Sequence, residues 1–377
     1  MFSAGEASGD QHAAAVFCAM RERIPDLRGS GMGSAAMRAV GIELTVDSSD
    51  IGVVGLGEVL RHYAAIRRAL TAMQQAACSQ RPDLLICVDY KEFNLKLARH
   101  AKACGIQVLF YVSPQVWAWR PGRVKKYGAA IDMMAVIFPF ETRFYEAHHI
   151  PVRYVGHPLA GRVQASAPRA SLLHAFGLNP YHPVIGLLPG SRKAEVQRLL
   201  PVMLQAAALL RAKQPELQFI LPQASTISDE LLQPLLQNAP VNVTRVHGRS
   251  YDALACCQAA MVASGTATLE TALMGVPMAV LYKVAPVTYF LLKPLIRIPN
   301  IALVNIVAER RVVQEFVQAA AKPHAIAAEI QRILDDPDYS AVMQHALGEV
   351  KARLGSADGV NTMAALACDM LQHKVTR

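Results

Sequence analysis

The chain has 377 residues, of which 53% are hydrophobic and 18% charged, and its formal net charge at pH 7 is +9. That length suits two domains, and the apolar content is high enough to bury large cores. The sequence has neither zinc-ligand spacing nor an aromatic-basic RNA-binding pattern, so the charge fits an anionic membrane or a phosphorylated substrate rather than nucleic acid, with diffuse surface charge as the alternative.

Two segments near the start of the chain attract attention. Residues 5–10, Gly-Glu-Ala-Ser-Gly-Asp, are typical of the loop after a first strand, although only four residues precede them. Residues 54–73 carry apolar side chains at helical spacing with arginines around them. A basic amphipathic helix can lie in a membrane interface, but a helix that packs against a core has the same pattern. Both interpretations remain open at this point.

Strand-like and helical stretches alternate along the rest of the chain, which predicts parallel sheets with helices on both faces. The predicted strands of the first half are 84–88, 108–112, 135–137 and 153–155, with helices at 64–77 and 93–103. After a small, polar linker at 161–168, strands are predicted near 184–188, 219–221, 243–246, 260–263 and 278–281. Helices at 325–334, 340–354 and 359–373 close the chain.

Two features of the first half suggest chemistry. Asp89 follows the strand at 84–88, and ligands of open α/β sheets bind at the carboxyl ends of strands. Its carboxylate could act as a general base on a hydroxyl, or it could cap the helix that contains Asn94. Residues 111–120 hold both tryptophans beside Gln115 and Arg120. They suit a wall that holds sugars or acyl groups, and core packing is the alternative.

Two strand-to-helix turns in the second half suit phosphate binding. The first, at residues 183–195, has the sequence Pro-Gly-Ser-Arg just before a predicted helix. The second, at 263–270, has Ser-Gly-Thr at a helix start and Glu270 one turn further along. Glycine lets a ligand approach the backbone, and a helix start offers unpaired N–H groups with a positive dipole. Glu270 could accept hydrogen bonds from ribose hydroxyls. Two such turns in one domain favour a nucleotide diphosphate over plain helix capping.

The remaining signals are mostly negative. Seven cysteines without a C-x-x-C motif predict reduced thiols in a cytosolic protein. No secretion signal opens the chain, and the apolar window 284–304 is broken by three prolines and two charges. Any membrane contact should therefore be peripheral. Asp336-Pro337-Asp338 has the Asp-x-Asp pattern of some metal-dependent transferases, but it fits a turn and helix start, so we expect no metal site.

Seven segments together resemble the lipid-A-disaccharide synthase family, from the first residues to about Asn305. They are Gly-Glu-Ala-Ser-Gly-Asp (5–10), Tyr-Val-Ser-Pro-Gln-Val-Trp-Ala-Trp-Arg (111–120), Phe-Pro-Phe-Glu (138–141), Gly-His-Pro (156–158), Leu-Pro-Gly-Ser-Arg (188–192), Ala-Ser-Gly-Thr-Ala-Thr-Leu-Glu (263–270) and Pro-Asn (299–300). The run with both tryptophans and the glycine/serine loop are the most specific in combination.

The resemblance implies an α/β protein of GT-B fold, in which two doubly wound Rossmann-like domains flank an interdomain cleft. We expect an N-terminal acceptor- and lipid-binding domain over residues 1–165 and a C-terminal UDP-sugar-binding domain over 166–340. Helices over 341–377 are expected to pack back on the N-terminal domain. The implied reaction is an inverting transfer from UDP-2,3-diacylglucosamine to 2,3-diacylglucosamine 1-phosphate (lipid X). It yields a β-1,6-linked disaccharide 1-phosphate and UDP, without cofactor or metal.

The resemblance also implies roles for individual residues. Asp89 matches an essential aspartate and is the candidate base, and Arg192 matches an essential arginine that stabilises the departing diphosphate. The donor side is expected to comprise Gly190, Ser191, Arg192, Glu195, Ser264, Gly265, Thr266, Glu270 and Asn300. The acceptor and lipid side is expected to comprise Glu6, Ser8, Asp10, Ser113, Gln115, Trp117, Trp119 and Arg120.

The helix over residues 54–73 matches the membrane-contacting part of such enzymes. The contacts are expected from Leu56, Val59, Leu60, Arg61, Tyr63, Ile66, Arg67 and Arg68. The implied partners are lipid-linked sugars and the anionic surface of the inner membrane on its cytoplasmic face, where the enzyme would be peripheral. A homodimer is left open.

The chain departs from the family pattern at Lys91 and Glu92, where Pro or a small residue and Asp or Gly are usual. A cation at Lys91 would lower the pKa of the proposed base. The nearest rival is another GT-B enzyme acting on UDP-N-acetylglucosamine, either a peptidoglycan precursor transferase or an epimerase, which would not need the tryptophan run. A nucleotide-sugar-binding regulator without activity is the non-enzyme alternative, but it predicts loss of Asp89 or Arg192, and both are present.

Overall fold

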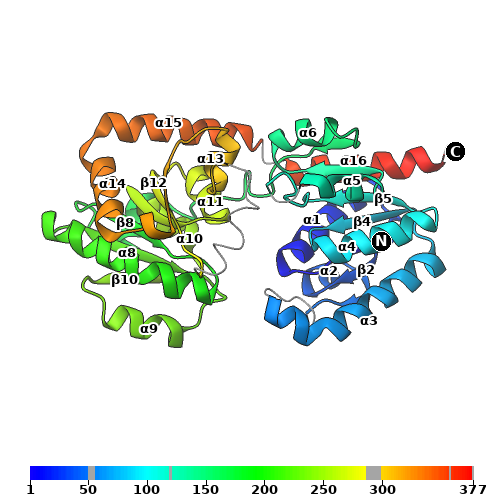
Figure 1. The fold of residues 1–377 in the computed structure, drawn as a ribbon, viewed down its shortest axis with the longest axis horizontal. Helices are drawn as coiled ribbons and strands as arrows, with labels where there is room; N and C mark the ends of the chain where they lie inside the picture. Colours follow the sequence, from blue (N-terminus) through cyan, green and yellow to red (C-terminus); the bar gives the residue numbers. More distant parts are fainter. Residues whose placement is uncertain (50–55, 119–120, 286–298, 356–357, 376–377) are drawn as a thin grey trace. The chain divides into compact units, whose positions relative to one another are not determined.

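The computed structural model describes residues 1–49, 56–118, 121–285, 299–355 and 358–375. The chain forms two compact units, each built around one parallel sheet with helices on both faces (Figure 1). Unit 1 comprises Met1–Pro158 and Gly355–Arg377, and unit 2 comprises Leu159–Leu354. The prediction of two doubly wound α/β domains is therefore confirmed.

Unit 1 holds a seven-stranded sheet of order β3-β2-β1-β4-β5-β6-β7. The strands are β1 (Phe2–Ala4), β2 (Ser30–Gly33), β3 (Glu43–Asp47), β4 (Leu84–Val88), β5 (Gln107–Tyr111), β6 (Met133–Val136) and β7 (Val152–Tyr154). The helices are α1 (Ala7–Arg23), α2 (Ala35–Ala39), α3 (Leu56–Gln80), α4 (Lys91–Ala103), α5 (Val124–Gly128), α6 (Pro139–Glu146) and α16 (Gly359–Val375). The short β1 pairs with both β2 and β4, so a three-residue strand occupies the middle of the sheet.

Unit 2 holds a six-stranded sheet of order β10-β9-β8-β11-β12-β13. The strands are β8 (Val184–Leu188), β9 (Gln218–Gln223), β10 (Val243–His247), β11 (Ala259–Ala263), β12 (Met278–Tyr282) and β13 (Gln314–Val317). The helices are α7 (Arg169–Ala175), α8 (Lys193–Lys213), α9 (Asp229–Gln237), α10 (Ser250–Cys256), α11 (Thr266–Leu273), α13 (Leu303–Ala308), α14 (Pro323–Asp335) and α15 (Pro337–Arg353). Strands β8 and β11 are buried at every position, as expected of central strands covered on both faces.

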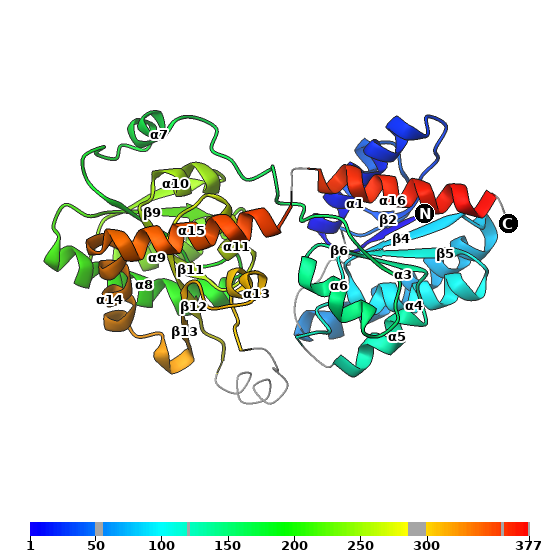
Figure 2. The ribbon, with the colours of Figure 1, turned by 90° about the horizontal axis from the view of Figure 1, so that it is seen from above.

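The unit boundaries differ from those predicted at residues 165 and 340. The chain passes between units at Pro158–Leu159 and again at Leu354–Gly355. Helix α15 packs against α11 and α13 of unit 2, and only α16 returns to unit 1, where it lies along α1 (Figure 2). The prediction that all of 341–377 packs on the N-terminal domain is therefore wrong for α15. Asp336 caps α15 by accepting from the Tyr339 N–H at 2.9 Å, as expected of a helix start.

Two further features bear on the sequence-based expectations. Cys78 and Cys104 are joined by a disulfide, with Cα atoms 6.0 Å apart. This corrects the expectation that the thiols would be reduced, at least for this pair. Among the described residues, no helix combines the length and the apolar character needed to cross a bilayer.

Candidate active site

The order in which the chain adds strands to the unit 2 sheet reverses between β8 and β11. From β8 the chain builds β9 and β10 on one side, and it then returns to place β11 on the other. Ligands of open α/β sheets bind outside the carboxyl ends of the strands at such a switch point. A cavity of about 550 Å³ lies there. The ends of β8, β9, β10 and β11 contribute Leu188, Pro189, Gly190, Ser191, Arg192, Glu195, Pro222, Gln223, Ala224, Ser225, Gly248, Ser250, Ala263, Ser264, Gly265, Thr266, Ala267 and Glu270.

The turn after β8 is held by contacts between Gly190, Arg192 and Glu195. Gly190 has φ +108°, and a Cβ at this position would lie 2.4 Å from Glu195 Oε2, so only glycine fits. Arg192 is the N-cap of α8, and its Nη1 donates to Glu195 Oε1 at 2.8 Å. Within the described part of the chain, its Nε and Nη2 groups bond to no protein acceptor. The side chain is 67% exposed. The guanidinium thus keeps donors for an anion in the cavity.

Thr226 fixes the same turn from a different loop. Its hydroxyl, in the segment after β9, donates to the Ser191 carbonyl at 2.6 Å. Sequence analysis missed this residue. The one signal that could have found it is its place after the carboxyl end of a strand next to β8, because those ends meet at one sheet edge.

The turn after β11 is the second wall of the cavity. Gly265 has φ +156° and is the N-cap of α11. Ser264 plays a different part from the one predicted, because its N–H donates to the Leu281 carbonyl and its hydroxyl donates to the Ile301 carbonyl. Both donors expected for a diphosphate are thus used inside the protein. The other donors at this turn are the N-terminal amides of α11, of which the Thr268 N–H donates to the Gly265 carbonyl. Amides at a helix start suit an anion.

Asn300 and Glu270 were both predicted to contact the nucleotide. Asn300 is 9% exposed and is not part of the cavity wall, although Ser264 anchors its neighbour Ile301. Glu270 lies on the wall and accepts a hydrogen bond from the Tyr251 hydroxyl at 3.1 Å. Burial raises the pKa of Glu270, and the Tyr251 hydrogen bond partly offsets this. Tyr251, in α10, is a further residue that sequence analysis missed.

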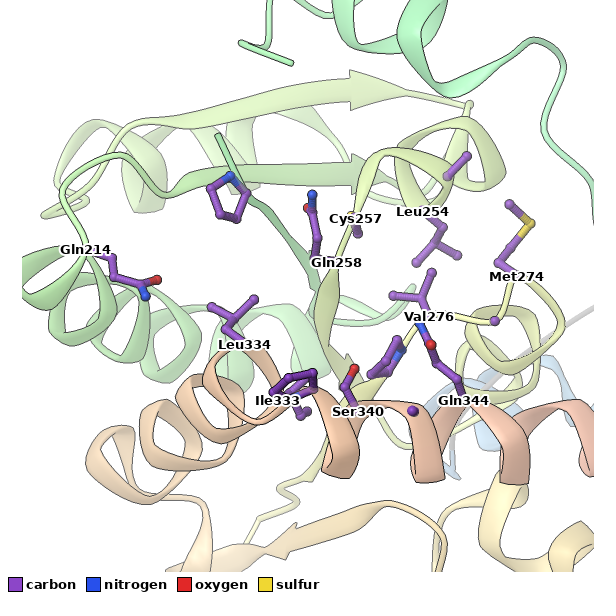
Figure 3. Close-up of a pocket in the computed structure, with 16 residues that line it drawn as sticks. Gln214, Leu254, Cys257, Gln258, Met274, Val276, Ile333, Leu334, Ser340 and Gln344 are labelled. Carbon is purple, nitrogen blue, oxygen red and sulfur yellow. The ribbon is translucent and has the colours of Figure 1, made fainter. Parts of the chain in front are cut away.

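A second cavity of unit 2, of about 570 Å³, differs in position and chemistry (Figure 3). Pro183, Gln258 and Pro277 on its wall directly precede β8, β11 and β12, so it lies at the opposite, amino edge of the sheet. Ile333 of α14 and Ser340 and Gln344 of α15 also line it. Of the described residues, no lysine, arginine, aspartate or glutamate lines it. It therefore lacks the cationic donors that a diphosphate requires.

Unit 1 repeats the arrangement at its own switch point, between β1 and β4. Residues 5–10 follow β1 and Asp89 follows β4, so the two predicted loops meet at one sheet edge. A Cβ at Gly5 would lie 2.3 Å from the Tyr90 ring, which shows how closely the loops approach. Burial raises the pKa of Tyr90, and the nearby Glu6 carboxylate raises it further.

The backbone at Asp89 is constrained. Asp89 and Tyr90 have φ values of +49° and +43°, a region that residues other than glycine adopt rarely and that recurs at functional sites. The Asp89 N–H donates to the Tyr111 carbonyl, and its carbonyl accepts from Asn94 Nδ2 at 2.8 Å. Asn94 is fully buried and also accepts from the Ser3 hydroxyl. Helix α4 begins at Lys91 with Tyr90 as its N-cap and has no side-chain capping hydrogen bond, so capping by Asp89, the alternative for this carboxylate, is not observed.

The three polar residues of the first loop have separate environments. Glu6 is half-buried at the N-cap of α1, and Ser8 is exposed on that helix. Asp10 is 2% exposed, and its carboxylate accepts from the Ser34 N–H and hydroxyl and from the N–H groups of Ala36 and Met37. Burial acts to raise the pKa of Asp10, but these donors outweigh it and hold the pKa below its ordinary value. Its role is therefore to cap α2 from within the protein, rather than to contact acceptor or lipid as predicted.

Glu141 organises the segment that follows β5. This carboxylate is 1% exposed and accepts hydrogen bonds from the Ser113 hydroxyl, from Trp117 Nε1 at 2.9 Å and from the Phe138 N–H at 3.1 Å. Burial raises the pKa of Glu141, and the donors counteract part of that effect. The Trp117 ring packs edge-on against Phe140, with centroids 4.9 Å apart. Gln115 is half-buried, and Trp119 and Arg120 lie outside the described residues.

The predicted membrane helix forms as α3 and begins at Leu56. Tyr63 is 56% exposed, and Arg67 and Arg68 are also exposed. Ile66, by contrast, packs against the core of unit 1, so its assignment to membrane contact is not supported. The side chains of Leu56, Val59, Leu60 and Arg61 lie outside the described residues.

Comparison with known proteins decides the family. The model of the lipid-A-disaccharide synthetase family matches residues 1–367. The chain belongs to this family. A lipid-A-disaccharide synthase of Geobacter sulfurreducens is 48% identical over 375 residues, covering 100% of this chain and 98% of the relative. The synthase of Nitrosococcus oceani is 46% identical, covering 98% and 95%. The lipid-A-disaccharide synthases are glycosyltransferases, and so is this protein.

Solved structures confirm the fold. A putative UDP-N-acetylglucosamine 2-epimerase of Listeria monocytogenes aligns with a TM-score of 0.64 at 11% identity, covering 96% of this chain and 92% of the epimerase. The calicheamicin glycosyltransferase CalG4 aligns with a TM-score of 0.60 at 16% identity, covering 99% and 97%. These likenesses confirm the predicted two-domain GT-B architecture.

Proposed function

We propose that this glycosyltransferase joins UDP-2,3-diacylglucosamine to 2,3-diacylglucosamine 1-phosphate with inversion, giving the β-1,6-linked disaccharide 1-phosphate and UDP. The observation that carries the donor side is the cavity at the β8/β11 switch point, where Arg192 and two helix starts meet. The wall offers guanidinium and amide donors for a diphosphate and the Glu270 carboxylate for ribose hydroxyls.

The acceptor side is assigned to unit 1, with Asp89 as general base. Its position after β4, at the switch point of the sheet, supports this role, as does its constrained backbone. Asp89 would take the proton from the acceptor hydroxyl as that oxygen attacks the anomeric carbon. Arg192 and the start of α8 would stabilise the negative charge that develops on the departing UDP. Inversion then requires a single displacement and no covalent intermediate.

We further propose that transfer needs no metal ion, because Arg192 and the N-termini of α8 and α11 supply positive charge where the diphosphate leaves. The enzyme would work on the cytoplasmic face of the inner membrane, where α3 presents Tyr63, Arg67 and Arg68 to anionic lipid. Exposed basic and aromatic side chains at one helix face support this position.

One assay tests the reaction. UDP release is measured with the diacylated donor, in the presence and absence of the diacylated acceptor phosphate, each with and without EDTA. Release that depends on both lipids and persists in EDTA is expected. UDP release without acceptor, or conversion of UDP-N-acetylglucosamine alone, would instead favour a hydrolase or an epimerase. Loss of release in EDTA that added Mg²⁺ restores would overturn the metal-free mechanism.

A further inference from the structure

Cys78, His100 and Cys104 form a cluster at the amino edge of the unit 1 sheet. Cys78 lies in the last turn of α3, which leads into β4, and His100 and Cys104 lie at the end of α4, which leads into β5. Asp89 follows the opposite, carboxyl end of β4. The cluster is therefore separate from the site described above, and nothing in the proposed transfer uses it.

The three side chains already converge on one point. One ligand atom from each residue lies within 4.8 Å of the others, and His100 Nε2 is 3.3 Å from Cys78 Sγ. His100 and Cys104 are four residues apart and share one face of α4. The Cys104 N–H donates to the His100 carbonyl at 3.1 Å, which fixes the backbone between them. The disulfide shows that both sulfur atoms can reach the same place.

The surroundings suit a bound ion. All three residues are half-buried, which gives access to solvent on one side and shelter on the other. Helices α3 and α4 pack together, with Ala76, Ala77 and Ala101 buried near the cluster in sequence. The scaffold that carries the three side chains is thus built into the core of unit 1, and ligand binding would require only side-chain adjustment.

We propose that the thiol form of this cluster binds one Zn²⁺ ion through Cys78 Sγ, Cys104 Sγ and His100 Nε2, with water in the fourth position. Thiolate and imidazole are the preferred ligands of zinc, at about 2.3 Å and about 2.0–2.1 Å. In a tetrahedral site those bond lengths place the sulfur and nitrogen ligands roughly 3.5 Å apart. The 3.3 Å between Cys78 Sγ and His100 Nε2 is close to that spacing. Two thiolates and a neutral imidazole balance the ion's charge, which a half-buried site requires.

Disulfide and metal compete for the same two sulfur atoms. A dithiol reductant breaks the Cys78–Cys104 bond by thiol–disulfide exchange, delivering two electrons and two protons and becoming a disulfide itself. Zn²⁺ then displaces the thiol protons without changing its own oxidation state. Occupancy of the site by zinc is therefore confined to the reduced protein.

Zinc binding to the intact protein tests this proposal. Wild-type protein is reduced, freed of reductant without air, and titrated with Zn²⁺ against a chromophoric chelator. One equivalent should bind, and Co²⁺ should give thiolate charge-transfer and tetrahedral visible bands. C78S and C104S should abolish the bands, and H100A should weaken binding at least ~10-fold. C18S, which removes an exposed free cysteine, is the matched control and should bind as wild type.

Two results would overturn the site. One is zinc binding by the C78S/C104S double variant as tight as that of reduced wild type, and the other is no binding by reduced wild type. Circular dichroism of each variant verifies that the fold is retained. The double variant should still release UDP in EDTA, because the cluster lies at the sheet edge opposite Asp89.

Discussion

At the scale of single residues, Asp89 combines a reactive group with an unusual backbone. Its φ of +49° is tolerated best by glycine, asparagine and aspartate. Asparagine is therefore a better probe than alanine, because it removes the proposed base and keeps the backbone preference. The geometry thus favours a polar residue at this position on conformational grounds as well as chemical ones.

Asp89→Asn should lower kcat by about 10²–10⁴-fold, the usual contribution of a general base, while UDP affinity stays unchanged. The rate is measured by UDP release and the affinity by calorimetry. Glu92→Gln changes a nearby carboxylate that pairs with Arg123 and serves as the control. A near-wild-type rate in Asp89→Asn would remove this residue from the mechanism.

Arg192→Ala should cost at least ~2–3 kcal/mol of transition-state stabilisation, or roughly 30- to 150-fold in kcat/KM. The loss is expected because the proposed role of the guanidinium is to stabilise the charge that develops on the leaving diphosphate. Arg198→Ala, six residues further along α8 and also exposed, is the matched control. An unchanged kcat/KM in Arg192→Ala would contradict the leaving-group role.

The buried ring of His157 should make the stability of the protein depend on pH in the acid range. Burial, with a smaller contribution from His12, lowers the pKa of His157 to about 4. The unfolded chain binds this proton below about pH 6.5, whereas the native state does not until about pH 4. This contribution to stability is therefore complete above about pH 6.5 and is lost as the pH falls through that window.

Between about pH 7.5 and about pH 5, this group alone should reduce the free energy of unfolding by roughly 2 kcal/mol. Urea unfolding at both pH values measures the change. Over this pH change, the free energy of unfolding of His157→Gln should fall by roughly 2 kcal/mol less than that of wild type. His345→Gln, which alters an 80% exposed ring, should behave as wild type. Equal losses in His157→Gln and wild type would show that another group is responsible.

At the scale of elements, α3 has two sides with different roles. Its last turns pack against unit 1 through Ala69, Met73 and Ala77, and Ile66 joins this packed side. Tyr63, Arg67 and Arg68 face solvent. The helix therefore packs against the core along part of its circumference and leaves an exposed basic strip, to which we assign the proposed contact with an anionic surface.

Arg67→Ala with Arg68→Ala should weaken binding to vesicles that contain anionic phospholipid by about 1 kcal/mol per residue, or roughly 30-fold together. The effect should shrink in high salt, because exposed charges are screened. Arg21→Ala with Arg23→Ala, exposed on α1, is the control pair. Sedimentation with vesicles measures both, and equal binding by the two pairs would argue against a membrane role for this strip.

Elements whose residues carry a local signal were predictable from sequence. The buried strands β4, β8 and β11 are continuous apolar runs, and both phosphate-type turns have glycine where the backbone requires it. Strands β2 and β13 escaped prediction because Ser-Gly-Met-Gly and Gln-Glu-Phe-Val lack an apolar run. Their strand conformation comes from pairing with β1 and β12.

The candidate site was predictable only where one segment carries it. Arg192 and Glu270 stand next to their glycine turns, so spacing indicated them. Thr226 and Tyr251 come from other loops and reach the site only through the sheet order. The capping role of Asp10 and the internal hydrogen bonds of Ser264 likewise depend on partners distant in sequence, and so do the Cys78–Cys104 pair, 26 residues apart.

At the scale of the whole molecule, unit 2 is one continuous segment and unit 1 is not. The fragment 159–354 should therefore fold cooperatively by itself and bind UDP with the affinity of the full chain, since its cavity is lined by its own residues. Calorimetric unfolding and UDP titration of this fragment test the prediction. Arg192→Ala in the same fragment is the control for specific binding, and a fragment that unfolds without a transition would contradict it.

Because helix α16 is made last and packs on α1, the order of synthesis affects when unit 1 can fold. It covers α1 with Met363, Ala364 and Ala367 buried, so the first helix made receives its cover from the last. Domains generally fold as units during translation at about 5–20 residues per second. Unit 2 can thus be complete on the ribosome while unit 1 still exposes α1. The apolar surface of α1 therefore stays uncovered while the 196 residues of Leu159–Leu354 are translated, which takes roughly 10–40 s.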